Sequence, residues 1–182
     1  MNMTVDLCSW AANLARVQLE GLPRRWQHTQ GVARQAERAR AVVDDPDLLV
    51  AAAWLHDVGY APRLVRTGVH ALDGAVFLSE LGAAQRLCGL VANHSCACVE
   101  ARNHGLEIEW SDERTPLRDA LWWADMTTTP SGGITDVSLR IDEVLDRYGP
   151  GHVVARSVAE ASEGLIAAAS RTERLLSGLA QV

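Results

Sequence analysis

An unbroken apolar run from Leu48 to Leu55 constrains this chain more than any other feature of its sequence. The run is eight residues long and leaves almost no polar face, so a helix that contains it must be buried on all sides. Asp45 and Pro46 precede the run as a cap and a first-turn proline, and Gly59 follows it. The sequence therefore predicts a buried central helix over about residues 46–58, around which the other elements pack.

Residue usage also favours helices over strands. The chain has 27 Ala and 22 Leu against 9 aromatic residues, and Ala and Leu are strong helix formers. We expect an all-α fold. One domain should span residues 1–182, with a core at about 24–128 and C-terminal helices at about 136–180, because a chain of this length buries roughly 70% of its unfolded surface. Further helices are predicted over about 5–20, 24–43, 70–81, 83–93, 116–126, 136–148 and 153–179.

Charge, hydropathy and cysteine content exclude several classes of protein. The net charge of −6 comes from 23 acidic and 17 basic residues, and every basic residue is Arg. No basic stripe is present, so we expect no nucleic acid polymer as a partner. The longest apolar run falls far short of the roughly 20 residues that span a bilayer, so we expect no membrane association. The N-terminal stretch has no basic start, and Asp6 interrupts it. Without export, the four Cys are expected to be reduced, which indicates a cytoplasmic protein.

Histidine and aspartate side chains fall at helix ends or on inward faces, where they can converge. Twelve residues separate His70 from Gly82, and another twelve separate Gly82 from His94. Two antiparallel helices over these residues are each about 18 Å long, so both imidazoles lie at the same end of the pair. The chain makes a similar excursion between His28 and His56. We expect one cluster, made of His28, His56, Asp57, His70, His94 and Asp125.

Imidazole and carboxylate groups together suit a divalent transition metal. Iron or manganese is favoured, and zinc also fits. Six ligands exceed the usual share of one ion, so two ions with Asp57 between them are the economical arrangement, although one ion stays an alternative. Each residue taken alone is more often an ordinary core or surface residue than a ligand. The buried apolar run changes this balance, because an Asp that follows it directly is costly unless something neutralises its charge.

The ordered pattern of these residues resembles a known family. His28 comes first, then His56-Asp57 in Leu-His-Asp-Val-Gly, then Asp125 in Trp-Ala-Asp-Met-Thr. This order is similar to that of the HD superfamily of metal-dependent phosphohydrolases, which have an all-helical bundle. His70 and His94 match the extra ligands of the dinuclear branch of that superfamily.

The resemblance implies a hydrolase that releases phosphate from a small phosphorylated metabolite or nucleotide. Asp57 or Asp125 would accept the proton of the attacking water. Many family members have a Lys directly after the His-Asp-Ile-Gly motif, whereas this chain has Tyr60 there and no Lys at all. Another cation must then neutralise the phosphate. Our candidates for substrate binding are Arg63 and Arg66, with Arg24 and Arg25 as a second option.

Two alternatives remain open at this point. The dinuclear branch also contains a few diiron oxygenases, and the same six ligands could hold two irons that activate dioxygen. The second alternative is a non-catalytic module that binds a small nucleotide. In every case the expected partner is a small molecule, and the apolar C-terminal helix could form a homodimer by pairing with a copy of itself.

Overall fold

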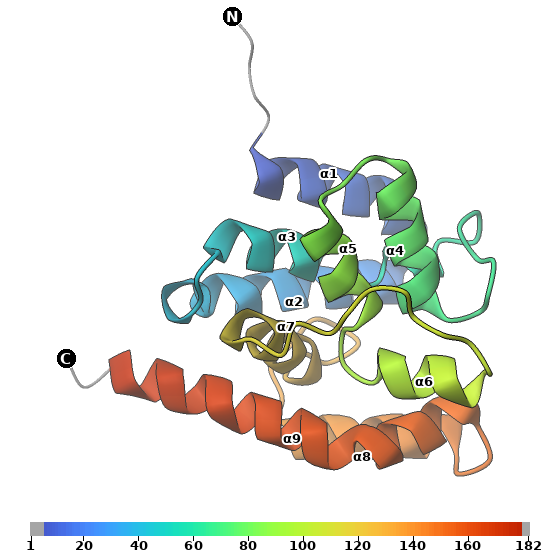
Figure 1. Cartoon of the computed structure of the whole chain (residues 1–182). Coiled ribbons are helices and arrows are strands. Elements are labelled where there is room, and N and C mark those ends of the chain that lie inside the picture. The colour runs from blue at the N-terminus through green and yellow to red at the C-terminus, as the bar shows by residue number, and fades with distance from the viewer. Residues whose placement is uncertain (1–5, 180–182) are drawn as a thin grey trace, which may run out of the picture.

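A computed structural model describes residues 6–179, and this part of the chain is a bundle of helices. Its regular elements are all helical, apart from one isolated β-bridge between Thr128 and Ile134. The predicted all-α fold is therefore confirmed. The elements in chain order are α1 (Leu7–Leu19), α2 (Pro23–Arg38), η1 (Arg40–Val42), α3 (Pro46–Leu55), η2 (Val58–Tyr60), α4 (His70–Glu80), α5 (Gln85–Ala92), α6 (Ala97–Asn103), α7 (Pro116–Met126), α8 (Val137–Tyr148) and α9 (Val153–Leu179) (Figure 1).

Helix α3 lies at the centre of the bundle, as the apolar run predicts. Asp45 caps its first turn by accepting a hydrogen bond from the backbone N–H of Leu48. Seven of its ten residues are buried, and Trp54 packs against Trp26 of α2 with the two rings tilted and their centres 5.7 Å apart. Figure 1 shows α1 on one side of α2 and α3, with α8 and α9 on the opposite side. The central layer therefore has protein on both faces.

Two predicted helix ends are wrong. The second helix was expected to reach Val43, but α2 ends at Arg38, and the chain tightens into η1 before Val43 becomes extended. Its successor Asp44 leads into Asp45-Pro46, and a residue before proline disfavours the helical conformation. The central helix was expected to reach Val58, but it ends at Leu55. The predicted start of the first helix, Val5, lies outside the described residues.

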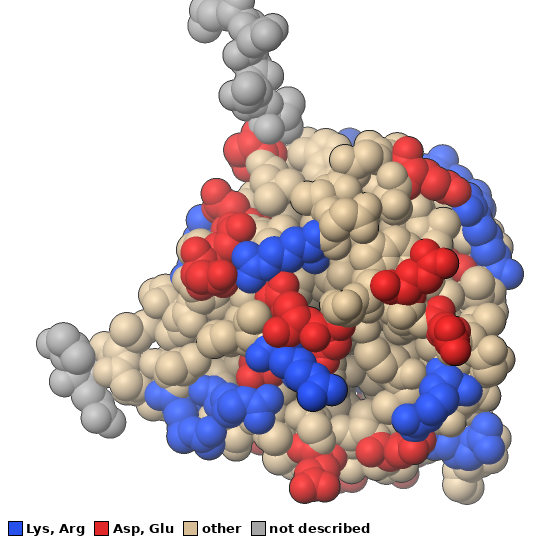
Figure 2. Space-filling model, in the orientation of Figure 1, with Lys and Arg blue, Asp and Glu red and all other residues tan. Residues whose placement is uncertain are grey.

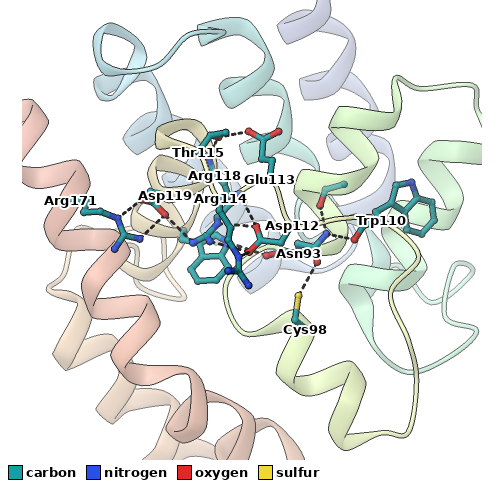
Figure 3. Close-up of polar contacts among 12 residues, drawn as sticks. Asn93, Cys98, Trp110, Asp112, Glu113, Arg114, Thr115, Arg118, Asp119 and Arg171 are labelled. Atoms are coloured by element: carbon teal, nitrogen blue, oxygen red, sulfur yellow. Dashed lines mark hydrogen bonds and ion pairs between the residues drawn. The ribbon is translucent and has the colours of Figure 1, made fainter.

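The C-terminal helices cover the side of the bundle opposite α1. In Figure 1, α9 runs along the edge of the molecule with α8 beside it, and α6 and α7 lie above them. Asp119 of α7 accepts hydrogen bonds from Arg171 of α9 at 2.6 and 3.0 Å and from its neighbour Arg118 at 2.9 Å. Figure 3 shows this ion-pair network, which connects α9 to α7.

The surface carries charges of both signs. On the face drawn in Figure 2, acidic and basic side chains lie interspersed rather than gathered by sign. Within residues 6–179, none of the helices combines the length and the hydropathy needed to cross a membrane.

Candidate metal centre

The six predicted ligands come from five helices and meet in the interior. His28 lies on α2, His56 and Asp57 directly follow α3, and His70 is the first residue of α4. His94 follows α5 closely, and Asp125 lies in the last turn of α7. Five of the six are at most 7% exposed, and His70 is partly buried. The turn between α4 and α5 brings His94 back to the end of this helix pair at which His70 lies, as the twelve-residue spacing predicts.

Ligand atoms of these side chains form two groups that share one carboxylate. His28, His56 and Asp57 offer atoms that all lie within 4.8 Å of one another, and so do Asp57, His70 and His94. The Nε2 atom of His70 is 3.4 Å from Asp57 Oδ1, and that of His56 is 3.6 Å from Asp57 Oδ2. Asp57 therefore stands between two sets of imidazoles, each large enough to bind an ion.

Asp125 extends the first group. Its Oδ1 atom is 3.0 Å from His28 Nε2 and 3.9 Å from His56 Nε2. Its other oxygen accepts a short hydrogen bond from the hydroxyl of Ser95. Ser95 has a φ of 50°, in the left-handed region that residues other than glycine rarely adopt. The strained backbone turns the Ser95 hydroxyl towards Asp125 and fixes the carboxylate.

Three of the imidazoles are oriented by backbone carbonyls. The Nδ1 atoms of His28, His56 and His94 lie 3.1, 2.8 and 2.7 Å from the carbonyl oxygens of Thr129, Ala53 and Val91. A carbonyl only accepts, so each Nδ1 donates, and Nε2 is the ring atom left to bind a metal. This arrangement is typical of metal-binding histidines. All three Nε2 atoms point into the cluster.

A buried polar atom without a partner lies within the donor set. His56 is fully buried, and its Nε2 atom has no hydrogen-bond partner among the described residues. Burial also lowers the pKa of His56 and of His70, so both rings are neutral at pH 7 and can act as ligands. A divalent cation would satisfy the lone pair of His56 and offset the carboxylates of Asp57 and Asp125. The residues therefore fit a divalent metal.

Arg25 supplies a positive charge beside the shared carboxylate. Its guanidinium donates to Asp57 Oδ2 at 3.1 Å and lies over the ring of Tyr60, 3.6 Å from the ring centre. Tyr60 in turn stacks on His70. Burial would raise the pKa of Asp57, but His56 and Arg25 outweigh it and hold that pKa below its usual value. Arg25 thus places a positive charge beside Asp57 and over the ring of Tyr60.

Gly59 allows the shared carboxylate to approach α4. A Cβ atom at this position would lie 1.9 Å from the carbonyl oxygen of His70 and 2.6 Å from the backbone nitrogen of Gly74. No side chain fits there. The glycine of the Leu-His-Asp-Val-Gly motif is therefore needed to bring Asp57 within reach of His70.

Arg63 and Arg66 do not line the cavity above the cluster, and their predicted role in substrate binding stays untested. Arg63 donates a hydrogen bond to Gln18, and Arg66 forms a bidentate ion pair with Glu80 at the surface. Asp73 of α4 accepts hydrogen bonds from the backbone N–H groups of residues 66–68 and so shapes the loop that leads into α4.

A second network supports His94 from outside. The side-chain amide of Asn93 donates to the carbonyl oxygens of Gly89 and Trp110, both at 2.9 Å, and its oxygen accepts from the thiol of Cys98. Figure 3 shows these bonds around Asn93. Trp122 donates to the Asn93 carbonyl oxygen. The polypeptide just before His94 is therefore fixed to α5, α6 and α7. The four cysteines are free.

The cluster lies at the base of a cavity that encloses about 530 Å³, part of it open to solvent. Arg25 of α2 and two arginines of α8, Arg140 and Arg147, line it together with Glu100 of α6. Sequence reasoning ranked Arg25 second and missed the other three. Their sequence signal is weak, because they lie far along the chain on amphipathic helices and reach the cavity only through packing. Apolar walls are added by Met126, Val144, Tyr148, Val154 and Val158.

Comparison with known proteins gives one match. A family model described as HD domain matches residues 25–137, which is more than half of the chain. The matched segment contains all six clustered ligands and ends where α8 begins. No curated protein and no solved structure matches the chain.

Proposed function

The chain belongs to the HD domain family, and from this we propose that it is a metal-dependent hydrolase that releases phosphate from a small phosphorylated metabolite or nucleotide. The observation that carries the proposal is the sharing of Asp57 by two groups of imidazoles at the base of an arginine-lined cavity. Transition ions suit the imidazoles, and guanidinium groups suit a phosphate.

Two divalent ions would occupy the two groups. His28, His56, Asp57 and Asp125 would hold one, and Asp57 with His70 and His94 would hold the other. Iron or manganese is our first choice, and zinc also fits this donor set. Ions bound here would supply a water of lowered pKa and a positive charge that polarises the phosphoryl oxygen.

The chain's own residues bind and orient the substrate. Arg25, held against Asp57 and Tyr60, is placed to donate to a phosphate at the base of the cavity. Both Asp57 and Asp125 are candidates to accept the proton of the attacking water. Asp125 is our first choice, because Asp57 also pairs with the guanidinium of Arg25, whereas Asp125 is fixed by Ser95 beside His28. The cavity volume suits a small molecule.

Anaerobic turnover tests this proposal. Protein loaded with iron or manganese should release inorganic phosphate from a panel of sugar phosphates and nucleotides in the absence of oxygen. Asp125→Asn should lower the rate by at least about 10²-fold, the effect expected for loss of a general base. The matched control is Asp142→Asn, an exposed residue of α8 that should keep the wild-type rate. Turnover that strictly requires dioxygen would contradict hydrolysis and favour the oxygenase alternative.

A further inference from the structure

A second hollow adjoins the metal cavity, and four of its six lining residues are arginines. Its lining residues are Arg24, Arg25, Arg140 and Arg147, with His28 and Pro130, and they include no carboxylate. It encloses about 430 Å³. Arg25, His28, Arg140 and Arg147 line both hollows, so the two spaces meet at these side chains.

The positive charge of this hollow is only partly compensated. Arg25 pairs with Asp57, while Arg140 and Arg147 share the single carboxylate of Glu143. Arg24 forms no ion pair within residues 6–179. Four guanidinium groups thus face two carboxylates, which leaves two positive charges beside a concave surface. Such an excess attracts anions.

Arg140 gives an independent sign of a missing ligand. The residue is 6% exposed, yet its Nε atom is buried and has no hydrogen-bond partner among the described residues. Buried N–H groups are nearly always paired in native proteins. The side chain lines both hollows, so an anion bound between them would lie against this guanidinium group.

We propose that the four-arginine pocket, made of Arg24, Arg25, Arg140 and Arg147, binds a second phosphate of the substrate, and that the preferred substrates are small bisphosphorylated molecules. One phosphate would lie at the metal cluster and the other in this pocket. The substrate class rests on the proposed function, whereas anion binding by the pocket does not. Arg140 and Arg147 lie on α8, beyond the segment that the HD domain model matches, so this specificity belongs to the added C-terminal part of the chain.

Phosphate binding to the chelator-treated protein tests the pocket without metal or turnover. Without cations the carboxylates of the cluster repel anions, so bound inorganic phosphate reports on the arginines. In calorimetry at low ionic strength, Arg24→Gln and Arg140→Gln should each weaken phosphate binding by at least about tenfold. Arg24 is exposed, so its variant should fold even if Arg140→Gln does not. The control, Arg156→Gln on the exposed face of α9, should bind as the wild type does. Equal phosphate affinity in Arg24→Gln and the wild type would overturn the proposal.

Substrate selectivity tests the substrate class. With metal-loaded protein, kcat/KM for propane-1,3-diol bisphosphate should exceed that for propyl phosphate by at least about tenfold, and Arg24→Gln should reduce this ratio towards one. The same carbon chain carrying a carboxylate and one phosphate distinguishes a requirement for phosphate from a general preference for anions. Equal kcat/KM for the bisphosphate and the monophosphate in the wild type would overturn the proposed substrate class. If neither compound releases phosphate, the proposed hydrolase activity is contradicted. Phosphate binding by the chelator-treated protein would still test whether the four-arginine pocket binds anions.

Discussion

Individual residues of the cluster could be predicted because their chemistry is visible in the sequence. An Asp close to the end of a buried apolar run needs a partner, and His28, His70 and His94 lie at helix positions that face the same region. Ser95 could not be predicted, because its contact with Asp125 depends on a left-handed backbone that nothing in the surrounding sequence signals. Arg25 was only a second option, since helix periodicity does not show which of two adjacent arginines points inward.

Glu100 is a buried carboxylate that lines the metal cavity without a hydrogen bond or ion pair to its side chain among the described residues. Burial raises its pKa above the ordinary value of 4.5. In acid the Glu100 side chain is protonated, so folding buries no charge there. As the pH rises through its folded-state pKa, the carboxylate ionises and lowers the free energy of unfolding.

Glu100→Gln should consequently stabilise the chelated protein at about pH 7, by on the order of 1 kcal/mol, and should lose this advantage at about pH 4. Urea unfolding at both pH values measures the difference. Glu163→Gln, on the exposed face of α9, should show no such pH dependence. A gain for Glu100→Gln that is the same at both pH values would rule out ionisation as its cause.

Elements were predicted where pattern and punctuation agree. The apolar run, Gly82 and the proline starts fix α3, the α4 and α5 pair, and α7 to within a few residues. Helix α6 was not predicted, because its seven residues carry no side-chain cap and are too short for a clear period. The end of α3 depends on a tertiary contact, since Asp57 leaves the helix to reach α4.

That contact makes Gly59 the critical position between α3 and α4. Gly59→Ala would force the backbone away from His70, so we expect a loss of about 2 kcal/mol or more in the free energy of unfolding and the loss of one bound ion of two. Urea titration and elemental analysis measure these effects. In contrast, Gly164→Ala places its Cβ in open space on α9 and should stabilise the protein by up to about 1 kcal/mol. Full metal content in Gly59→Ala would show that the close approach is dispensable.

On the scale of the whole molecule, the C-terminal helices complete the cavity that the HD domain segment begins. Their existence was predicted from periodicity, but the arginines that they bring to the cavity were not. Pairing of α9 with a second copy stays a prediction, as do the single domain and the cytoplasmic location.

The attachment of α9 depends on Asp119, which is 7% exposed and contacts both Arg118 and Arg171. Asp119→Asn should lower the free energy of unfolding by about 2 kcal/mol or more, because it leaves the buried Arg118 with less compensation. Arg171→Gln should cost less than about 1 kcal/mol, because that side chain is 47% exposed. Denaturant unfolding of the two variants compares these losses, and a larger loss for Arg171→Gln would reverse the assignment.

The central claim is that Asp57 joins two metal sites in one cluster. Elemental analysis of protein purified without chelator tests it most directly, with wild type and Asp57→Asn prepared in parallel and folding checked by circular dichroism. Our account predicts about two transition-metal ions per chain in the wild type and well under one in folded Asp57→Asn. Well under one ion in the wild type, or an unchanged metal count in Asp57→Asn, would contradict it.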